Sequence, residues 1–192
     1  MDTRWTRMVQ LVIIAGLGAS LAGCNWYSML NAKKSIKAGH QLYQAQEYER
    51  AVVAYEEVVA DPGAFEKDPD LTTAYFYLGN SYDNMYRPSR KGEQENDEFL
   101  IKAVKNYELA ADLIPDPGLK QLSMQYLVAS YGIDKLNDPG QAEPIIRRMI
   151  EGNPEETTNY FALARLYEDS GLYDLAEETL VSARDIRPED AA

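Results

Sequence analysis

The chain has 192 residues, which suits one domain and a processing segment, and its 31 acidic and 19 basic residues give a formal net charge of −12. This acidity argues against a nucleic-acid partner, which needs a clustered face of Lys and Arg, and against a basic membrane-surface mechanism. Because the chain has one cysteine, Cys24, and one histidine, His40, it cannot form an internal disulfide or a Cys/His zinc site on its own.

The first 24 residues have the pattern of a signal peptide. Arg4 and Arg7 precede an apolar run of about 15 residues, 8–22, which is short for a membrane span and typical of a signal-peptide core. The run ends in Leu-Ala-Gly-Cys at residues 21–24, which resembles the lipobox of bacterial lipoproteins. The resemblance implies that Cys24 carries a diacylglycerol and a further acyl chain such as palmitate, and two or three chains hold a protein stably on a membrane. The alternative is an uncleaved anchor in which Cys24 is incidental.

Cleavage before Cys24 would remove residues 1–23 and leave 192 − 23 = 169 residues. In the lipoproteins that the segment resembles, an Asp after the cysteine retains the protein at the inner membrane. Asn25 therefore implies the periplasmic face of the outer membrane of a bacterium with two membranes. Residues 24–31 are expected to form a short lipidated tether.

Four amphipathic helix pairs are predicted beyond the tether. They span about residues 32–65, 72–116, 121–155 and 157–190. Each pair has a close-packing position in its first helix, an alanine in its second helix and a proline at its end, since small side chains let antiparallel helices approach and proline stops a helix. In chain order these residues are Gly39, Ala51 and Pro62; Gly79, Ala103 and Pro115; Val128, Ala142 and Pro154; and Ala164, Ala176 and Pro188.

This spacing resembles the tetratricopeptide repeat (TPR), whose 34-residue pattern is Trp-x2-Leu-Gly-x2-Tyr, then Ala-x3-Phe, then Pro. The fourth pair is the clearest copy, with Tyr160, Ala164 and Leu180 in place of the Trp, Gly and Phe. The resemblance covers residues 32–188, followed by a short tail at 189–192. It implies an all-α fold, a TPR solenoid of about four helix-turn-helix repeats wound into a right-handed superhelix with a concave inner face.

The second pair contains an insertion. Gly79 and Ala103 are 24 positions apart, whereas the equivalent Gly39 and Ala51 are 12 apart, which places an insertion near residues 87–98. The inserted segment is basic first and acidic afterwards. Insertions in repeat proteins map to loops on one face and are often functional. The alternative is a solvated loop whose two halves pair electrostatically.

The sequence contains no convincing catalytic set. A Ser-His-Asp arrangement would depend entirely on His40, and a Cys-His pair would need the cysteine that the lipid is expected to consume. Gly16 and Gly18 lie in the signal-peptide core and not in a phosphate-binding loop. We therefore expect no enzyme activity, no cofactor and no metal.

The TPR resemblance implies that first-helix positions beside the packing residues line a concave, partner-binding groove. Phe76 and Phe161 fall at equivalent positions, with Asn80 and Arg165 one turn later, and exposed aromatic rings beside hydrogen-bonding groups suit an extended or helical peptide. The alternative is that these rings pack against the previous repeat. The candidate partner-binding residues are Ile36, His40, Tyr43, Phe76, Asn80, Asp83, Gln125, Phe161 and Arg165.

Together these expectations describe a membrane-anchored TPR scaffold or adaptor that binds another envelope protein or peptide. Its layout is similar to TPR lipoproteins that assist outer-membrane assembly and to those of secretion and pilus machinery. The alternative function is a cell-wall-associated binding or regulatory protein that recruits peptidoglycan enzymes or binds glycan.

Overall fold

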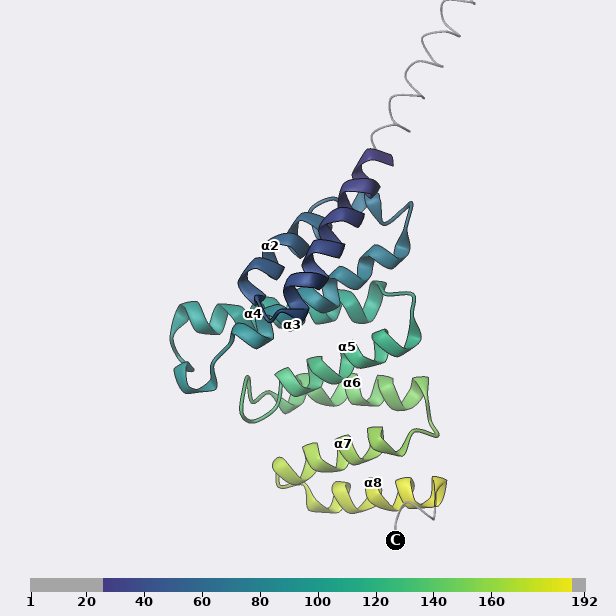
Figure 1. The fold of residues 1–192 in the computed structure, drawn as a ribbon. Coiled ribbons are helices and arrows are strands. Elements are labelled where there is room, and N and C mark those ends of the chain that lie inside the picture. Colours follow the sequence, from purple (N-terminus) through teal and green to yellow (C-terminus); the bar gives the residue numbers. More distant parts are fainter. Residues whose placement is uncertain (1–25, 188–192) are drawn as a thin grey trace, which may run out of the picture.

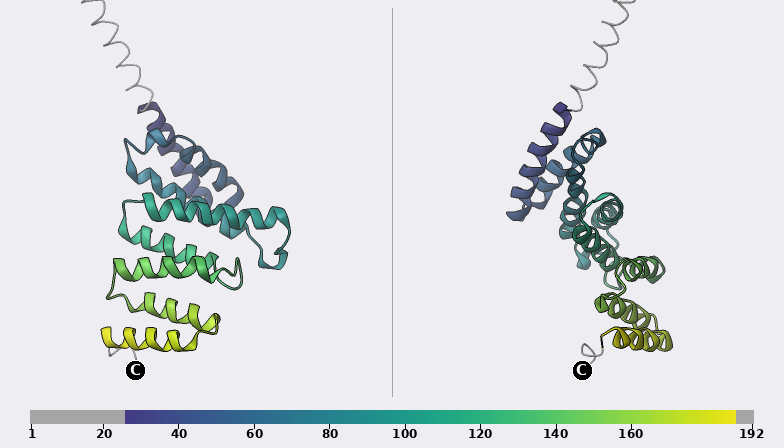
Figure 2. Two further views of the ribbon diagram at one scale, coloured as in Figure 1. Left: turned by 180° about the vertical axis from the view of Figure 1, so that it is seen from behind. Right: turned by 90° about the vertical axis from the view of Figure 1, so that its right-hand side faces the viewer.

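The structure is a computed structural model that describes residues 26–187, so Cys24, the rest of the expected signal peptide and Pro188 lie outside the described residues. Antiparallel helix pairs stack into an elongated, curved solenoid, with the N-terminal helix at one end and α8 at the other (Figures 1 and 2). The helices are the N-terminal helix (residues 26–44), α2 (Tyr48–Val59), α3 (Thr73–Met85), α4 (Gln94–Leu113), α5 (Pro117–Ser130), α6 (Pro139–Gly152), α7 (Thr157–Asp169) and α8 (Tyr173–Ile186). Short 3-10 turns lie at η1 (Pro62–Ala64), η2 (Pro69–Thr72) and η3 (Pro88–Arg90).

Each helix packs mainly against its neighbours in the chain, as expected for a solenoid. The first pair is the N-terminal helix with α2, and the later pairs are α3 with α4, α5 with α6, and α7 with α8. The predicted all-α TPR solenoid is confirmed within residues 26–187. In the TPR order, the N-terminal helix, α3, α5 and α7 are the first helices of the pairs, and the face that they form is called the first-helix face below.

The close approach of the two helices within a pair depends on glycine in the first two repeats. A Cβ atom at Gly39 would lie 2.6 Å from the Cε1 atom of Tyr55, whose ring is fully buried on α2. At Gly79 the same atom would lie 3.0 Å from the Tyr107 ring and 3.1 Å from the Ala103 carbonyl oxygen on α4. The glycine at this position of the TPR pattern thus leaves the space into which a buried tyrosine of the second helix packs.

The core is continuous across the first three repeats and becomes smaller toward the C-terminus. One cluster runs from Met29 to Ala142, and a separate, smaller cluster holds Ile146, Leu163 and Tyr167. The last pair has no further repeat to pack against within the described residues. Within residues 26–187, no helix combines the length and the apolar composition that crossing a bilayer requires.

Two segments differ from their expected structure. Residues 26–31, expected to belong to a tether, are helical, because Met29 and Ala32 pack into the core. Within the expected insertion, residues 94–98 are already part of α4.

The remaining part of the insertion is a short loop that is tied to α4. The buried side chain of Asn96 accepts a hydrogen bond from the Arg87 amide at 2.8 Å and donates to the Arg87 carbonyl at 3.1 Å. Arg90 pairs with Glu93 at 2.6 Å, and Gly92, with a φ of 96°, donates its amide to Asp97. This local pairing of basic and acidic halves agrees with the electrostatic alternative for the insertion. Figure 1 shows the loop and the first turns of α4 projecting from one side of the stack.

Candidate binding site on the first-helix face

A cavity of about 480 Å³ opens on the first-helix face where the first three repeats meet. Its size falls in the usual range for ligand pockets. It is called the tyrosine pocket below, and its lining residues are Tyr43, Tyr48, Asn80, Asp83, Asn84, Tyr86, Arg87, Pro88, Tyr126 and Lys135. These residues come from four helices and two connecting segments, so the pocket is assembled only when the repeats stack.

Aromatic rings from successive repeats form its walls. The Tyr43 ring meets the Tyr48 and Tyr77 rings edge to face, with centroids 5.7 and 5.4 Å apart. The Tyr126 ring lies 5.6 Å from the ring of Phe76 in an edge-to-face contact. Such pairs hold one another in place, and they leave apolar surface of Tyr43, Tyr48 and Tyr126 facing the cavity.

A hydrogen-bond network fixes the centre of the pocket. The Asn80 Oδ1 atom accepts from the Tyr43 hydroxyl at 2.6 Å and from Asn84 Nδ2 at 2.8 Å. Asn80 Nδ2 donates to the Tyr107 hydroxyl at 3.1 Å, and Asn80 itself is buried. The Asn80 amide therefore orients its neighbours. Asn84 lines the pocket, and the hydrogen bonds of its side chain within residues 26–187 are made by its Nδ2 atom, which leaves its Oδ1 atom to accept one from a ligand.

Two tyrosine hydroxyls of the pocket, those of Tyr43 and Tyr86, stay protonated at neutral pH. Burial, followed by the nearby Tyr48, Tyr126 and Tyr77 hydroxyls, raises the pKa of Tyr43. Burial, followed by the charges of Asp97 and Asp83, raises the pKa of Tyr86. Both hydroxyls thus remain hydrogen-bond donors.

Charged and unsatisfied groups complete the pocket. Lys135 forms an ion pair with Asp83, which joins the segment after α5 to α3. The Tyr86 hydroxyl is buried and finds no hydrogen-bond partner within residues 26–187. Buried hydroxyls normally have a partner, so Tyr86 is a donor that a bound ligand or a water could satisfy. The pocket therefore offers apolar rings, amide groups and both signs of charge.

Three of the candidate partner-binding residues meet in this pocket, namely Tyr43, Asn80 and Asp83. His40 lies outside it, with Nδ1 2.8 Å from the Tyr55 hydroxyl and its ring 4.5 Å from the Tyr77 ring. Burial lowers the pKa of His40, and these contacts give the imidazole a role in packing. Ile36 packs against the core on the same helix, whereas Gln125 is exposed on α5.

Phe76 and Phe161 have different environments despite their equivalent positions. Phe76 is only 5% exposed and packs against Tyr107 and Tyr126, so the packing alternative holds for it, although the covering ring comes from the following repeat. Phe161 is 41% exposed and lines a separate cavity of about 330 Å³ against α8. No repeat follows α8 within the described residues, so no ring of a following repeat covers Phe161 there. Arg165 is exposed on α7. The candidate residues therefore do not form one continuous groove.

Seven lining residues of the pocket were not among the predicted partner-binding residues, namely Tyr48, Asn84, Tyr86, Arg87, Pro88, Tyr126 and Lys135. Tyr126 is adjacent to the predicted Gln125, which is exposed on α5 and does not line this pocket. Lys135 belongs to the extra residues between α5 and α6. The length of this connection was the one sequence signal for a functional segment here. The contact of Lys135 with Asp83 could not be read from it, because that contact depends on how α3 and α5 stack.

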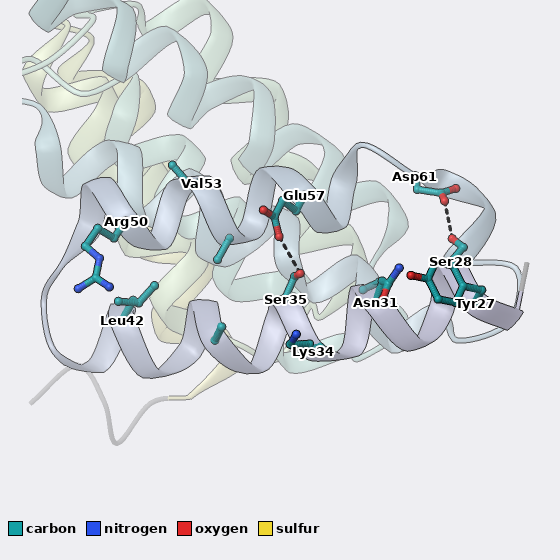
Figure 3. Close-up of a pocket in the computed structure, with 13 residues that line it drawn as sticks. Tyr27, Ser28, Asn31, Lys34, Ser35, Leu42, Arg50, Val53, Glu57 and Asp61 are labelled. Atoms are coloured by element: carbon teal, nitrogen blue, oxygen red, sulfur yellow. Dashed lines mark hydrogen bonds between the residues drawn. The ribbon is translucent and has the colours of Figure 1, made fainter.

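A larger cavity, of about 900 Å³, lies over the outer face of the N-terminal helix and α2 (Figure 3). Ser28 and Ser35 cross its floor with hydrogen bonds to Asp61 and Glu57. Inside the stack, the next helix fills the equivalent groove, so an open groove is the expected consequence of being the first pair. The tyrosine pocket has no such explanation, and it is the better candidate site.

Comparison with known proteins gives structural similarities only. No protein-family model matches the sequence, and no curated protein matches it. The chain is similar to TTC0263, a thermophilic TPR protein of Thermus thermophilus, at 19% identity over 83% of this chain and 93% of that chain, with a TM-score of 0.49. It is similar to YrrB, a TPR protein with an unusual peptide-binding site, at 21% identity over 80% and 68% of the chains (TM-score 0.43), and to MamA at 17% identity over 84% and 94% (TM-score 0.37). The helix pairs described above, and not these similarities, define the fold.

Proposed function

We propose that this protein is a membrane-anchored scaffold that holds an extended segment of another envelope protein in the tyrosine pocket. The observation that carries the proposal is the pocket itself, which combines tyrosine rings with the Asn84 amide and the Asp83–Lys135 ion pair. An extended peptide alternates apolar side chains with backbone donors and acceptors. Rings and amides held side by side on a rigid scaffold match that alternation.

The rest of the pocket supports binding in preference to catalysis. The Asn80 side chain accepts from the Tyr43 hydroxyl and donates to the Tyr107 hydroxyl, so it positions these two rings. The raised pKa of Tyr43 keeps its hydroxyl protonated, so it is not available as a base at neutral pH. Within residues 26–187 no group of three or more His, Cys, Asp or Glu side chains is placed to hold a metal ion. The pocket thus presents a preformed binding surface.

The anchor and the location are inferred from the sequence. The Leu-Ala-Gly-Cys segment at 21–24 supports a lipid on Cys24, and Asn25 supports the periplasmic face of the outer membrane. A scaffold in that position would act in the assembly of outer-membrane, secretion or pilus machinery.

A second candidate function is glycan binding at the cell wall, including the recruitment of peptidoglycan enzymes. Exposed faces of tyrosine rings beside an amide also suit a sugar, which is the observation that favours it. The Asp83–Lys135 pair favours a peptide ligand over a glycan, because the backbone and charged side chains of a peptide can interact with both the carboxylate and the ammonium group.

The two functions are separated by quantifying what co-purifies with the protein after crosslinking in cells, with Tyr48→Ser and Asn84→Ala variants beside the wild type. Both side chains line the pocket without being fully buried, so the fold is expected to persist. Loss of one envelope protein from both variants supports the peptide proposal. Unchanged capture by both variants contradicts it, and binding of the purified protein to isolated sacculi supports the glycan alternative.

A further inference from the structure

The first turns of the N-terminal helix present large apolar side chains to solvent. Trp26, Tyr27 and Leu30 are 60%, 68% and 46% exposed, whereas Met29 is buried against the core. At about 100° per residue the three exposed residues share one stripe of the helix. Trp and Tyr are the residues that favour a membrane–water interface, where the ring body lies in an apolar layer and the polar tip in a wet one.

The same stripe continues into two lysines. Lys34 and Lys37 are exposed, and neither forms an ion pair within residues 26–187. Residues 26–44 contain three lysines and no Asp or Glu, in a chain of net charge −12. Although the chain as a whole is acidic, this one helix carries a net positive charge, which complements anionic lipid headgroups.

The position of the anchor places this stripe at a bilayer. Trp26 follows Cys24 by two residues, and two residues of extended chain span at most about 7 Å. A diacylglycerol on Cys24 would therefore hold Trp26 within the headgroup layer.

The N-terminal helix is firmly joined to the solenoid. Ser28, next to Tyr27 on this helix, donates a hydrogen bond to Asp61 in the segment after α2 (Figure 3). Lys33 forms an ion pair with Asp68 at 2.7 Å. Together with the buried Met29, these contacts leave no hinge between the helix and the stack. A contact between the stripe and a membrane would therefore orient the whole solenoid.

We propose that the exposed stripe of the N-terminal helix docks into the headgroup region of an anionic bilayer. The stripe consists of Trp26, Tyr27, Leu30, Lys34 and Lys37. This inference rests on the proposed lipid on Cys24. Docking holds the solenoid at a set angle to the membrane and the tyrosine pocket at a set distance from it, which a flexible tether would not do.

The experiment uses the protein purified from its own membranes and reconstituted into vesicles of phosphatidylethanolamine and phosphatidylglycerol. The chain has two tryptophans, Trp5 and Trp26, and cleavage before Cys24 leaves Trp26 as the only one. Its fluorescence is recorded with two quenchers, brominated lipid in the bilayer and acrylamide in the water. The reference is the same protein in water after enzymatic removal of its lipid. Relative to this lipid-free protein, we expect the vesicle-bound protein to emit at shorter wavelength and to be quenched severalfold less by acrylamide. We also expect brominated lipid to quench it strongly.

The matched control compares two variants with the same change of charge. Lys34→Glu with Lys37→Glu reverses the stripe, and Lys91→Glu with Lys105→Glu reverses two exposed lysines elsewhere. We expect only the first to restore acrylamide quenching and to do so without releasing the protein from co-floating vesicles.

The outcomes separate the anchor from the docking surface. An intact mass without lipid, together with failure to co-float, overturns the anchor and this inference with it. Co-flotation with a lipid mass, but with Trp26 as open to acrylamide as in the lipid-free protein, overturns the docking surface alone.

Discussion

Replacing Gly39 by alanine is a direct test of how the helices of a pair are held together. The added Cβ atom would lie 2.6 Å from Tyr55 Cε1 and 2.9 Å from two further ring atoms, whereas ordinary carbon contacts are about 3.5–4.0 Å. The Tyr55 ring cannot retreat easily. It is fully buried, stacks on Tyr77 and is hydrogen-bonded to His40.

The expected loss of stability follows from two opposing effects. Forcing an extra methyl group into a packed core costs about 1–3 kcal/mol. Alanine recovers up to about 1 kcal/mol because it is a better helix former than glycine. We therefore expect Gly39→Ala to lower the free energy of unfolding by about 1–2 kcal/mol, with a loss in Tm of about 2–4 °C for each kcal/mol in a domain of this size.

Urea and thermal unfolding of the purified variants, followed by far-UV circular dichroism, measures this change. Gly152→Ala in α6 is the control, because its Cβ would meet no atom within 4 Å, and we expect it to be neutral or slightly stabilising. In a Tyr55→Leu background the penalty of Gly39→Ala should shrink, since the clashing ring is gone. Equal stability of Gly39→Ala and wild type, or an undiminished penalty in the Tyr55→Leu background, would refute the reasoning.

Three further predictions concern single side chains. Phe76→Ala should lower stability by about 3–5 kcal/mol and Phe161→Ala by less than about 1 kcal/mol, because only Phe76 is buried, and the same unfolding assay decides this. The imidazole of His40, the only one in the chain, should titrate below its unfolded value of about 6.5 by NMR. Since the unfolded chain then binds that proton more readily, stability should fall as pH drops from about 6.5 and level off below the folded pKa, and a value at or above 6.5 contradicts the burial argument. Lys135→Ala should cost about 1–3 kcal/mol by leaving Asp83, whose side chain is 11% exposed, without its cation, and an unchanged urea midpoint would show that the pair contributes nothing.

The helix pairs were predictable because their signals are local. The spacing of Gly39, Gly79 and Ala164 to the alanines of the second helices marks the close contacts, and Ser170-Gly171 marks a turn in which Gly171 has a φ of 71°. Each of these signals concerns atoms that are near in sequence or repeat at a fixed period. The sequence therefore predicted which residues pack within a pair.

The candidate site was only partly predictable because it depends on how repeats cover one another. Phe76 and Phe161 occupy the same position of the pattern, yet Tyr126 of the next repeat buries the first and nothing among the described residues covers the second in that way. Lys135 of the third repeat reaches Asp83 of the second, which no local spacing reveals. The expected tether was also wrong over residues 26–31, since the core contact of Met29 extends the helix.

The central claim is that a polypeptide binds in the tyrosine pocket. The most direct test is to place a photo-crosslinking phenylalanine analogue at Tyr48, inside the pocket, and at Ile101, which is 60% exposed on α4 away from it, and to irradiate cells that make either protein. The account predicts that position 48 captures a discrete envelope polypeptide, that position 101 does not, and that Asn84→Ala weakens the capture. Capture at 101 but not at 48, or adducts at 48 that consist of cell-wall glycan, would contradict it.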